Sequence, residues 1–70
     1  MDIHLLAVDP LSNPIKSWII TPVKSSDVLA VVTYCENRAK YIVETGINNT
    51  AVDTPFEALA HVETQLQRVN

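Results

Sequence analysis

A chain of 70 residues has room for one domain, and a domain this small buries only about 60% of the surface that its unfolded chain exposes. With 47% hydrophobic and 19% charged residues, the composition excludes a disordered chain, and the net charge of −3 disfavours a mainly electrostatic grip on nucleic acid. The single cysteine, Cys35, excludes an internal disulfide and argues against a closed zinc site. We therefore expect one domain, residues 1–70, whose stability is thin without a partner.

The first two β-strands are expected before residue 22. Residues 3–8, IHLLAV, form a short apolar run that ends at Asp9-Pro10, a turn signal. Residues 15–21, IKSWIIT, are β-branched and aromatic, and the proline at position 22 should end the strand. A loop of about six residues between the two runs favours antiparallel pairing.

The middle of the chain, residues 25–46, supports two interpretations because it is apolar at nearly every position from 28 to 32. As strands, residues 28–35 and 40–47 form a hairpin around a polar turn in which Asn37 can adopt a left-handed conformation. As a helix over residues 27–39, the same segment gives a strand-strand-helix-strand-helix order. The many β-branched residues favour the hairpin, and the helix is the alternative.

A C-terminal helix has the clearest signals. Thr54 is expected to be its N-cap and Pro55 its first helical residue, and Glu57 completes a capping box three residues after the cap. Apolar residues then recur at three- and four-residue spacing and predict one amphipathic face: Phe56, Leu59, Val62, Leu66 and Val69.

These elements predict an α+β fold, an antiparallel sheet of about four short strands with the C-terminal helix packed on one face. A helix is about 10–12 Å wide and covers two to three strands, so the opposite face of the sheet should stay uncovered. Each aliphatic side chain left in water there forgoes roughly 1.5–3 kcal/mol. We therefore predict self-association as a homodimer, or binding to another protein, through an interaction surface of four residues: Leu29, Val31, Ile42 and Trp18, the last in competition with its neighbour Ile19 for that face.

No set of residues predicts catalysis, a metal or a cofactor. Cys35 has no base on its own strand, because His4 and His61 lie on other elements, and it should behave as a small hydrophobe. Gly46 is the only glycine, which argues against a phosphate-binding loop. We expect a non-enzymatic protein without a cofactor. The alternative function is weak binding of single-stranded nucleic acid through an aromatic side chain and nearby cations: Trp18, Lys16, Arg38 and Lys40.

The start of the chain, MDIHLLAVDP, shows no basic leader, and its apolar run is too short for a signal peptide or a membrane span. With one reduced cysteine, this predicts a cytoplasmic protein without a membrane partner. Regulatory and inhibitory proteins of phages and bacteria are often this small and plain. We therefore predict a small acidic protein-binding module of that regulatory type.

Residues 40–66, KYIVETGINNTAVDTPFEALAHVETQL, resemble the strand, short loop and threonine-initiated helix that close many small bacterial and phage modules, HicB-type antitoxins among them. The shared points are the capping box and the triplet Glu57-Ala58-Leu59. The glycine-rich strand that precedes this segment in those antitoxins is absent here. The resemblance therefore transfers no residue role.

Overall fold

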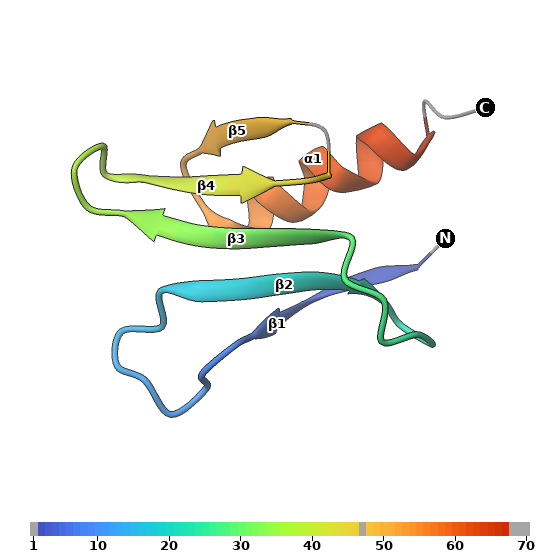
Figure 1. The fold of residues 1–70 in the computed structure, drawn as a ribbon, viewed down its shortest axis with the longest axis horizontal. Coiled ribbons are helices and arrows are strands. Elements are labelled where there is room, and N and C mark those ends of the chain that lie inside the picture. The colour runs from blue at the N-terminus through green and yellow to red at the C-terminus, as the bar shows by residue number, and fades with distance from the viewer. Residues whose placement is uncertain (1, 47, 68–70) are drawn as a thin grey trace.

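The computed structural model describes residues 2–46 and 48–67, which form a five-stranded sheet followed by one helix (Figure 1). Each strand pairs antiparallel with the next one along the chain, so the sheet order is β1-β2-β3-β4-β5. The predicted α+β fold is confirmed, and residues 30–35 form a strand in place of the alternative helix. The elements are β1 (Ile3–Ala7), β2 (Ser17–Pro22), β3 (Ala30–Cys35), β4 (Lys40–Glu44), β5 (Asn49–Val52) and α1 (Pro55–Gln67).

The prediction of about four strands misses β5. Residues 49–52 pair with β4, with Ala51 opposite Ile42 and Asn49 opposite Glu44. Asn49 and Ala51 are poor strand formers and Thr50 and Val52 are good ones, so pairing with β4 is what completes this short edge strand. Ile47, the end of the predicted fourth strand, lies outside the described residues.

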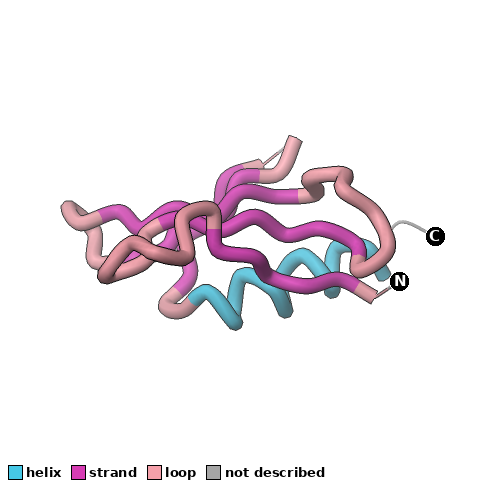
Figure 2. Tube along the Cα trace, turned by 90° about the horizontal axis from the view of Figure 1, so that it is seen from below, coloured by secondary structure: helices cyan, strands magenta, loops and turns pink. Residues whose placement is uncertain are grey.

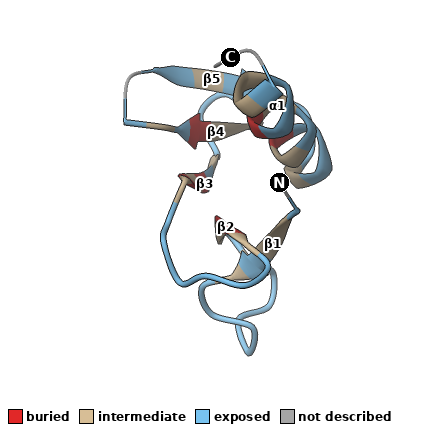
Figure 3. Ribbon diagram, turned by 90° about the vertical axis from the view of Figure 1, so that its right-hand side faces the viewer, coloured by how far each residue is buried: buried red, intermediate tan, exposed pale blue. Residues whose placement is uncertain are grey.

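The sheet and the helix form two layers. Figure 2 shows the strands on one side and α1 on the other. Viewed from its right-hand side, the sheet follows an arc from β5 to β1, and α1 lies on the inner side of that arc (Figure 3). The helix contacts β1, β3, β4 and β5. We call the side of the sheet toward α1 the helix face and the other side the open face.

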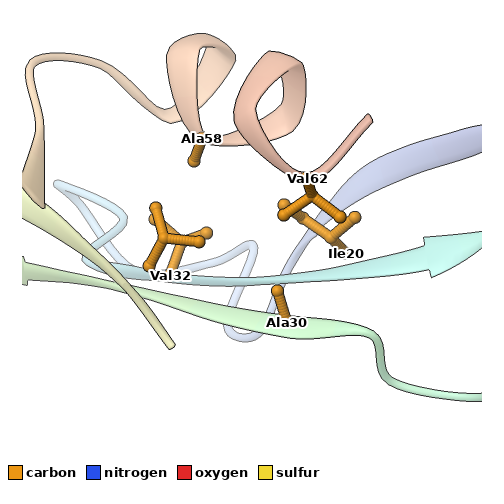
Figure 4. Close-up of a cluster of buried hydrophobic side chains, with 6 residues drawn as sticks. Ile20, Ala30, Val32, Ala58 and Val62 are labelled. Carbon is orange, nitrogen blue, oxygen red and sulfur yellow. The ribbon is translucent and has the colours of Figure 1, made fainter. Parts of the chain in front are cut away.

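The core lies between the helix face and α1. The register sets Val32 opposite both Trp18 and Val43, so these three side chains share the helix face. Figure 4 shows Ala58 and Val62 of α1 directed toward the sheet. The buried core consists mainly of small aliphatic side chains, which let the helix lie close to the strands: Ile20, Ala30, Val32, Val43, Ala58 and Val62.

Thr54 caps α1 as the sequence predicts. Its hydroxyl oxygen accepts a hydrogen bond from the Glu57 N–H at 3.1 Å, and its carbonyl accepts one from the Ala58 N–H at 3.3 Å. The Glu57 carboxylate accepts a bond from the N–H of Asp53 at 2.9 Å, one residue before the position that a capping box uses. The cap therefore ties the first turn of α1 to the segment that leaves β5.

Loss of this cap should destabilise the fold measurably. Thr54→Ala is expected to lower the free energy of unfolding by about 1 kcal/mol, because it leaves a helix N–H without its partner. The matched control is Thr64→Ala, since the Thr64 hydroxyl donates to the Ala60 carbonyl within the helix and is exposed. Urea unfolding followed by circular dichroism measures both, and equal losses would contradict the role of Thr54.

Phe56 does not belong to the packed face of α1, contrary to the sequence prediction. The residue is 77% exposed, whereas Leu59 and Leu66 pack against the core and Val62 is buried. Each helical residue advances about 100° around the axis, so side chains six residues apart point about 120° away from each other. The position of Phe56 before Val62 therefore turns it toward solvent. Val69 lies outside the described residues.

A turn of four residues, 36–39, joins β3 to β4. Within the described residues, Ala39 is the non-glycine residue with a positive φ, at 52°, so the left-handed position is not Asn37 as expected. This conformation brings the alanine Cβ close to the following carbonyl oxygen and costs roughly 1–2 kcal/mol.

Ala39→Gly should stabilise the protein. Glycine removes the steric cost but adds freedom to the unfolded chain, so we expect a net gain of about 0.5–1 kcal/mol in the free energy of unfolding. Ala60→Gly, in the exposed middle of α1, is the matched control and should lose about 1 kcal/mol. Thermal unfolding of both variants tests this prediction. If Ala39→Gly were less stable than the wild type, the steric cost at Ala39 would be refuted.

Candidate interaction surface

The open face carries an oblique stripe of apolar side chains. Leu6 is opposite Ile19, and Ile19 is opposite Val31, in one row across the first three strands. In the adjacent row, Ile42 is opposite Ala51 on the last two strands. Every strand thus contributes one side chain to this open-face stripe.

The residues of the stripe are half-buried or exposed, and none is fully buried. Leu6 is 43% exposed and Ala51 is exposed, while Ile19, Val31 and Ile42 are half-buried. On the helix face, by contrast, Ile20 is 0% exposed, although it directly follows Ile19 on the same strand. No described helix or strand lies over the stripe (Figure 2), whereas Thr21, further along the open face of β2, is only 2% exposed.

The predicted interaction residues divide between the two faces. Val31 and Ile42 lie in the open-face stripe, as expected. Trp18 lies on the helix face, where it packs against the core, and Ile19 takes its place on the open face. Leu29 precedes β3 and is half-buried against the core cluster. Their role in binding stays a prediction.

Two members of the stripe were not predicted. Leu5 and Leu6 are adjacent and both apolar, so only the register of β1 with β2 places Leu6 on the open face, opposite Ile19. Ala51 was missed because β5 is only four residues long and follows an asparagine-rich bend, although its β-branched Thr50 and Val52 alternate along the strand.

Charged side chains flank the stripe on β4. On the open face this strand presents Lys40, Ile42 and Glu44 in that order. The Lys40 ammonium donates to the carboxylate of Asp53, just beyond β5. This hydrogen bond, the attraction to the same carboxylate and the nearby Glu57 raise the pKa of Lys40. A cation and an anion thus lie on either side of one apolar residue.

A shallow hollow of about 300 Å³ lies near the β3–β4 turn. Its lining mixes apolar and polar groups and includes the free thiol of Cys35. The residues that line it are Cys35, Arg38, Ile42, Asn49, Thr50 and Ala51.

The two histidines lie on different elements and each has a hydrogen-bond partner. His4 shares a hydrogen bond with Thr21 at 2.9 Å, and His61 shares one with Gln65 at 3.1 Å. No group of three metal-ligating side chains occurs among residues 2–46 and 48–67.

Three aromatic side chains of the sheet form a separate cluster on the helix face. Trp18 meets Tyr41 edge to face with ring centroids 5.5 Å apart, and the centroids of Tyr34 and Tyr41 are 5.0 Å apart. All three rings are half-buried, and Tyr41 contacts both of the others. Their main packing is therefore within the fold.

Two of the three cations in the nucleic-acid alternative are engaged in ion pairs. The Lys16 ammonium lies 2.6 Å from the Glu36 carboxylate, and Lys40 bonds to Asp53. The hydrogen bond from Lys16 and the attraction between the charges lower the pKa of Glu36 and raise the pKa of Lys16. The pair therefore stabilises the fold above the ordinary pKa of glutamate, and that contribution disappears as pH falls through the lowered pKa of Glu36.

Removal of the Lys16 charge should release this effect. In Lys16→Met, the pKa of Glu36 should rise back toward the ordinary glutamate value, because the donor and the positive charge are gone. Lys24→Met, in the exposed segment after β2, is the control and should leave that pKa unchanged. A carboxyl-carbon NMR titration reports the pKa directly, and an unchanged value in Lys16→Met would contradict the pairing.

Comparison with known proteins adds no further constraint. No family model, curated protein or solved structure matched this chain. Among the described residues, no helix has both the length and the apolar character needed to cross a membrane. The functional proposal therefore depends on the open-face stripe and on Lys40 and Glu44, the charged residues that flank it on β4.

Proposed function

We propose that this protein is a non-enzymatic protein-binding module that associates with a second copy of itself through the open face of its sheet. The observation that carries the proposal is the open-face stripe, in which five strands each expose one apolar side chain with no described layer above them. Contiguous apolar surface of this kind marks interaction sites, because its removal from water is favourable at about 25 cal/mol per Å².

Self-association suits a sheet whose buried core is small. Among the described residues, the six buried apolar ones include two alanines and no aromatic side chain, so the core supplies a modest share of stabilisation. A second copy over the open face would cover Val31, Ile42 and Ala51 of each chain. We extend the proposal to a regulatory role through another protein in the cytoplasm, where the free Cys35 stays reduced.

The test of self-association is a comparison of two aspartate substitutions. The wild-type chain should show an average mass that rises above 7.8 kDa with concentration in sedimentation equilibrium. Ile42→Asp should stay at the mass of one chain, because it places a charge in the stripe. Val28→Asp, at an exposed position before β3, is the matched control and should associate like the wild type.

Circular dichroism of all three proteins separates lost association from lost folding. A folded wild type that stays at 7.8 kDa throughout would overturn self-association. An Ile42→Asp variant that associates as strongly as the wild type would instead exclude the open face as the contact.

The nucleic-acid alternative receives no specific support from the geometry. Trp18 is half-buried on the helix face, and Lys16 and Lys40 are already paired with carboxylates. Stacking on bases requires an accessible ring, and a carboxylate beside each of these lysines offsets the positive charge that would attract a phosphate. We therefore do not propose it as a second function.

A further inference from the structure

The open face of β4 is self-complementary in charge. Lys40 and Glu44 lie on either side of Ile42 at equal steps along the strand, about 7 Å each. If a second β4 lies antiparallel over the first with Ile42 at the centre, Lys40 of each copy faces Glu44 of the other. A parallel arrangement would instead set lysine against lysine. Charge therefore favours the antiparallel arrangement.

The same antiparallel placement of two copies also brings matching side chains of β3 together. On the open face it presents Val31, Thr33 and Cys35, with Thr33 at the centre. Antiparallel placement about Thr33 sets Val31 of one copy against Cys35 of the other, which are both apolar. The two Thr33 hydroxyls then face each other, and each hydroxyl can both donate and accept a hydrogen bond.

Strand β5 adds a third complementary set. Asn49 and Ala51 lie on its open face, and the Asp53 carboxylate follows at the same spacing, bonded to Lys40. The same rotation about Ala51 brings the Asn49 amide of one copy to the Asp53 carboxylate of the other. An amide N–H donating to a carboxylate is a favourable pair.

One axis serves all three strands, because their central residues lie in one row. The register sets Thr33 opposite Ile42 and Ile42 opposite Ala51. From these juxtapositions we infer that two copies pack open face to open face about a twofold axis over this row, with β3, β4 and β5 of each copy antiparallel to the same strands of the other. This geometry rests on the proposed self-association and specifies how it occurs.

The shape of the sheet limits the size of this contact. The arc in Figure 3 makes the open face convex, so two copies touch over β3–β5 and diverge toward β1. These three strands have four to six residues each and together cover roughly 14 Å by 17 Å, well below the ~800 Å² per partner of a standard interface. The dimer is therefore a weak one that forms at high protein concentration. The hollow lined by Ile42 and Ala51 provides room for a side chain of the second copy.

The sharpest test is to mix two charge variants. Lys40→Glu carries two acidic residues on β4, and Glu44→Lys carries two basic ones, so each variant alone should dimerise at least tenfold more weakly than the wild type. An equimolar mixture should recover dimers, because both facing pairs regain opposite charges. Sedimentation equilibrium of each protein and of the mixture measures this, up to about millimolar concentration. Val23→Lys, at an exposed position beyond β2, is the control for added charge and should associate like the wild type.

A cross-linking measurement covers the case in which Lys40→Glu fails to fold after losing its bond to Asp53. In Val31→Cys, the new thiol should lie over the native Cys35 of the second copy, so bismaleimidoethane should link the copies rapidly. The wild type and Val28→Cys, whose new thiol lies before β3, should link at least tenfold more slowly.

The outcomes separate the geometry from self-association itself. Recovery of dimers in the mixture, or fast cross-linking of Val31→Cys, supports the twofold arrangement. A wild type that dimerises while the mixture shows no recovery and Val31→Cys links no faster than Val28→Cys overturns this arrangement and leaves the proposed function standing. A wild type that is monomeric up to millimolar concentration overturns both.

Discussion

Ile20→Ala should lower the free energy of unfolding by about 2–5 kcal/mol, whereas Ile19→Ala, one residue earlier, should lower it by less than about 1.5 kcal/mol. Ile20 is 0% exposed between the sheet and α1, so its truncation leaves a cavity lined by core residues. Ile19 lies on the open face, where water can fill the space of a shortened side chain.

The loss expected for Ile20→Ala is a large share of the total free energy of unfolding. Natural domains are stable by roughly 0.05–0.15 kcal/mol per residue, or about 4–10 kcal/mol for a chain of this size. Urea unfolding at low micromolar concentration, where the weak dimer is dissociated, compares the two variants directly. Equal losses at Ile19 and Ile20 would mean that the two faces of the sheet are equally buried, which contradicts the two-layer fold.

Ala58→Leu should lower the free energy of unfolding by about 1–3 kcal/mol. Ala58 is 0% exposed and points from α1 toward Val32, so three added carbon atoms have no space without a shift of the helix (Figure 4). Leucine is a strong helix former, so the loss cannot come from helix propensity.

Ala60→Leu is the matched control for this substitution. Ala60 lies two residues further along α1 and is exposed, so the same added atoms enter solvent there. We expect a change within about 0.5 kcal/mol in the free energy of unfolding, measured by urea titration. If Ala58→Leu were equally neutral, the close approach of α1 to the sheet would be wrong.

Local signals predicted the elements that local interactions determine. Thr54, Pro55 and Glu57 mark the start of α1 because a cap uses residues within one turn of each other. The β3–β4 hairpin was favoured over a helix because β-branched residues restrict the backbone locally. The α+β fold follows from these elements.

Features that depend on pairing with a distant segment could not be predicted from local sequence signals. The strand β5 forms because β4 offers it a hydrogen-bonding edge, and its four residues include only two strand formers, Thr50 and Val52. Trp18 and Ile19 are adjacent and both apolar, so only the register with Val32 and Val31 decides which one faces α1. The left-handed residue of the turn is set by the four-residue loop length, which moves it from Asn37 to Ala39.

The candidate surface was predicted in outline and not in composition. An uncovered face containing Val31 and Ile42 followed from the width of one helix against several strands. Leu6 and Ala51 complete the stripe only once both edge strands are known. The charge symmetry of Lys40 and Glu44 around Ile42 requires the face assignment of β4, which the register supplies.

The most direct test of open-face association is a dilution series followed by methyl and amide NMR. Between about 1 mM and about 20 μM, signals of Val31, Ile42 and Ala51 should shift with concentration, while those of the buried Val43 and Ala58 should stay constant. Shifts confined to α1 or the helix face, or no concentration dependence at all, would contradict the association of two copies through the open face.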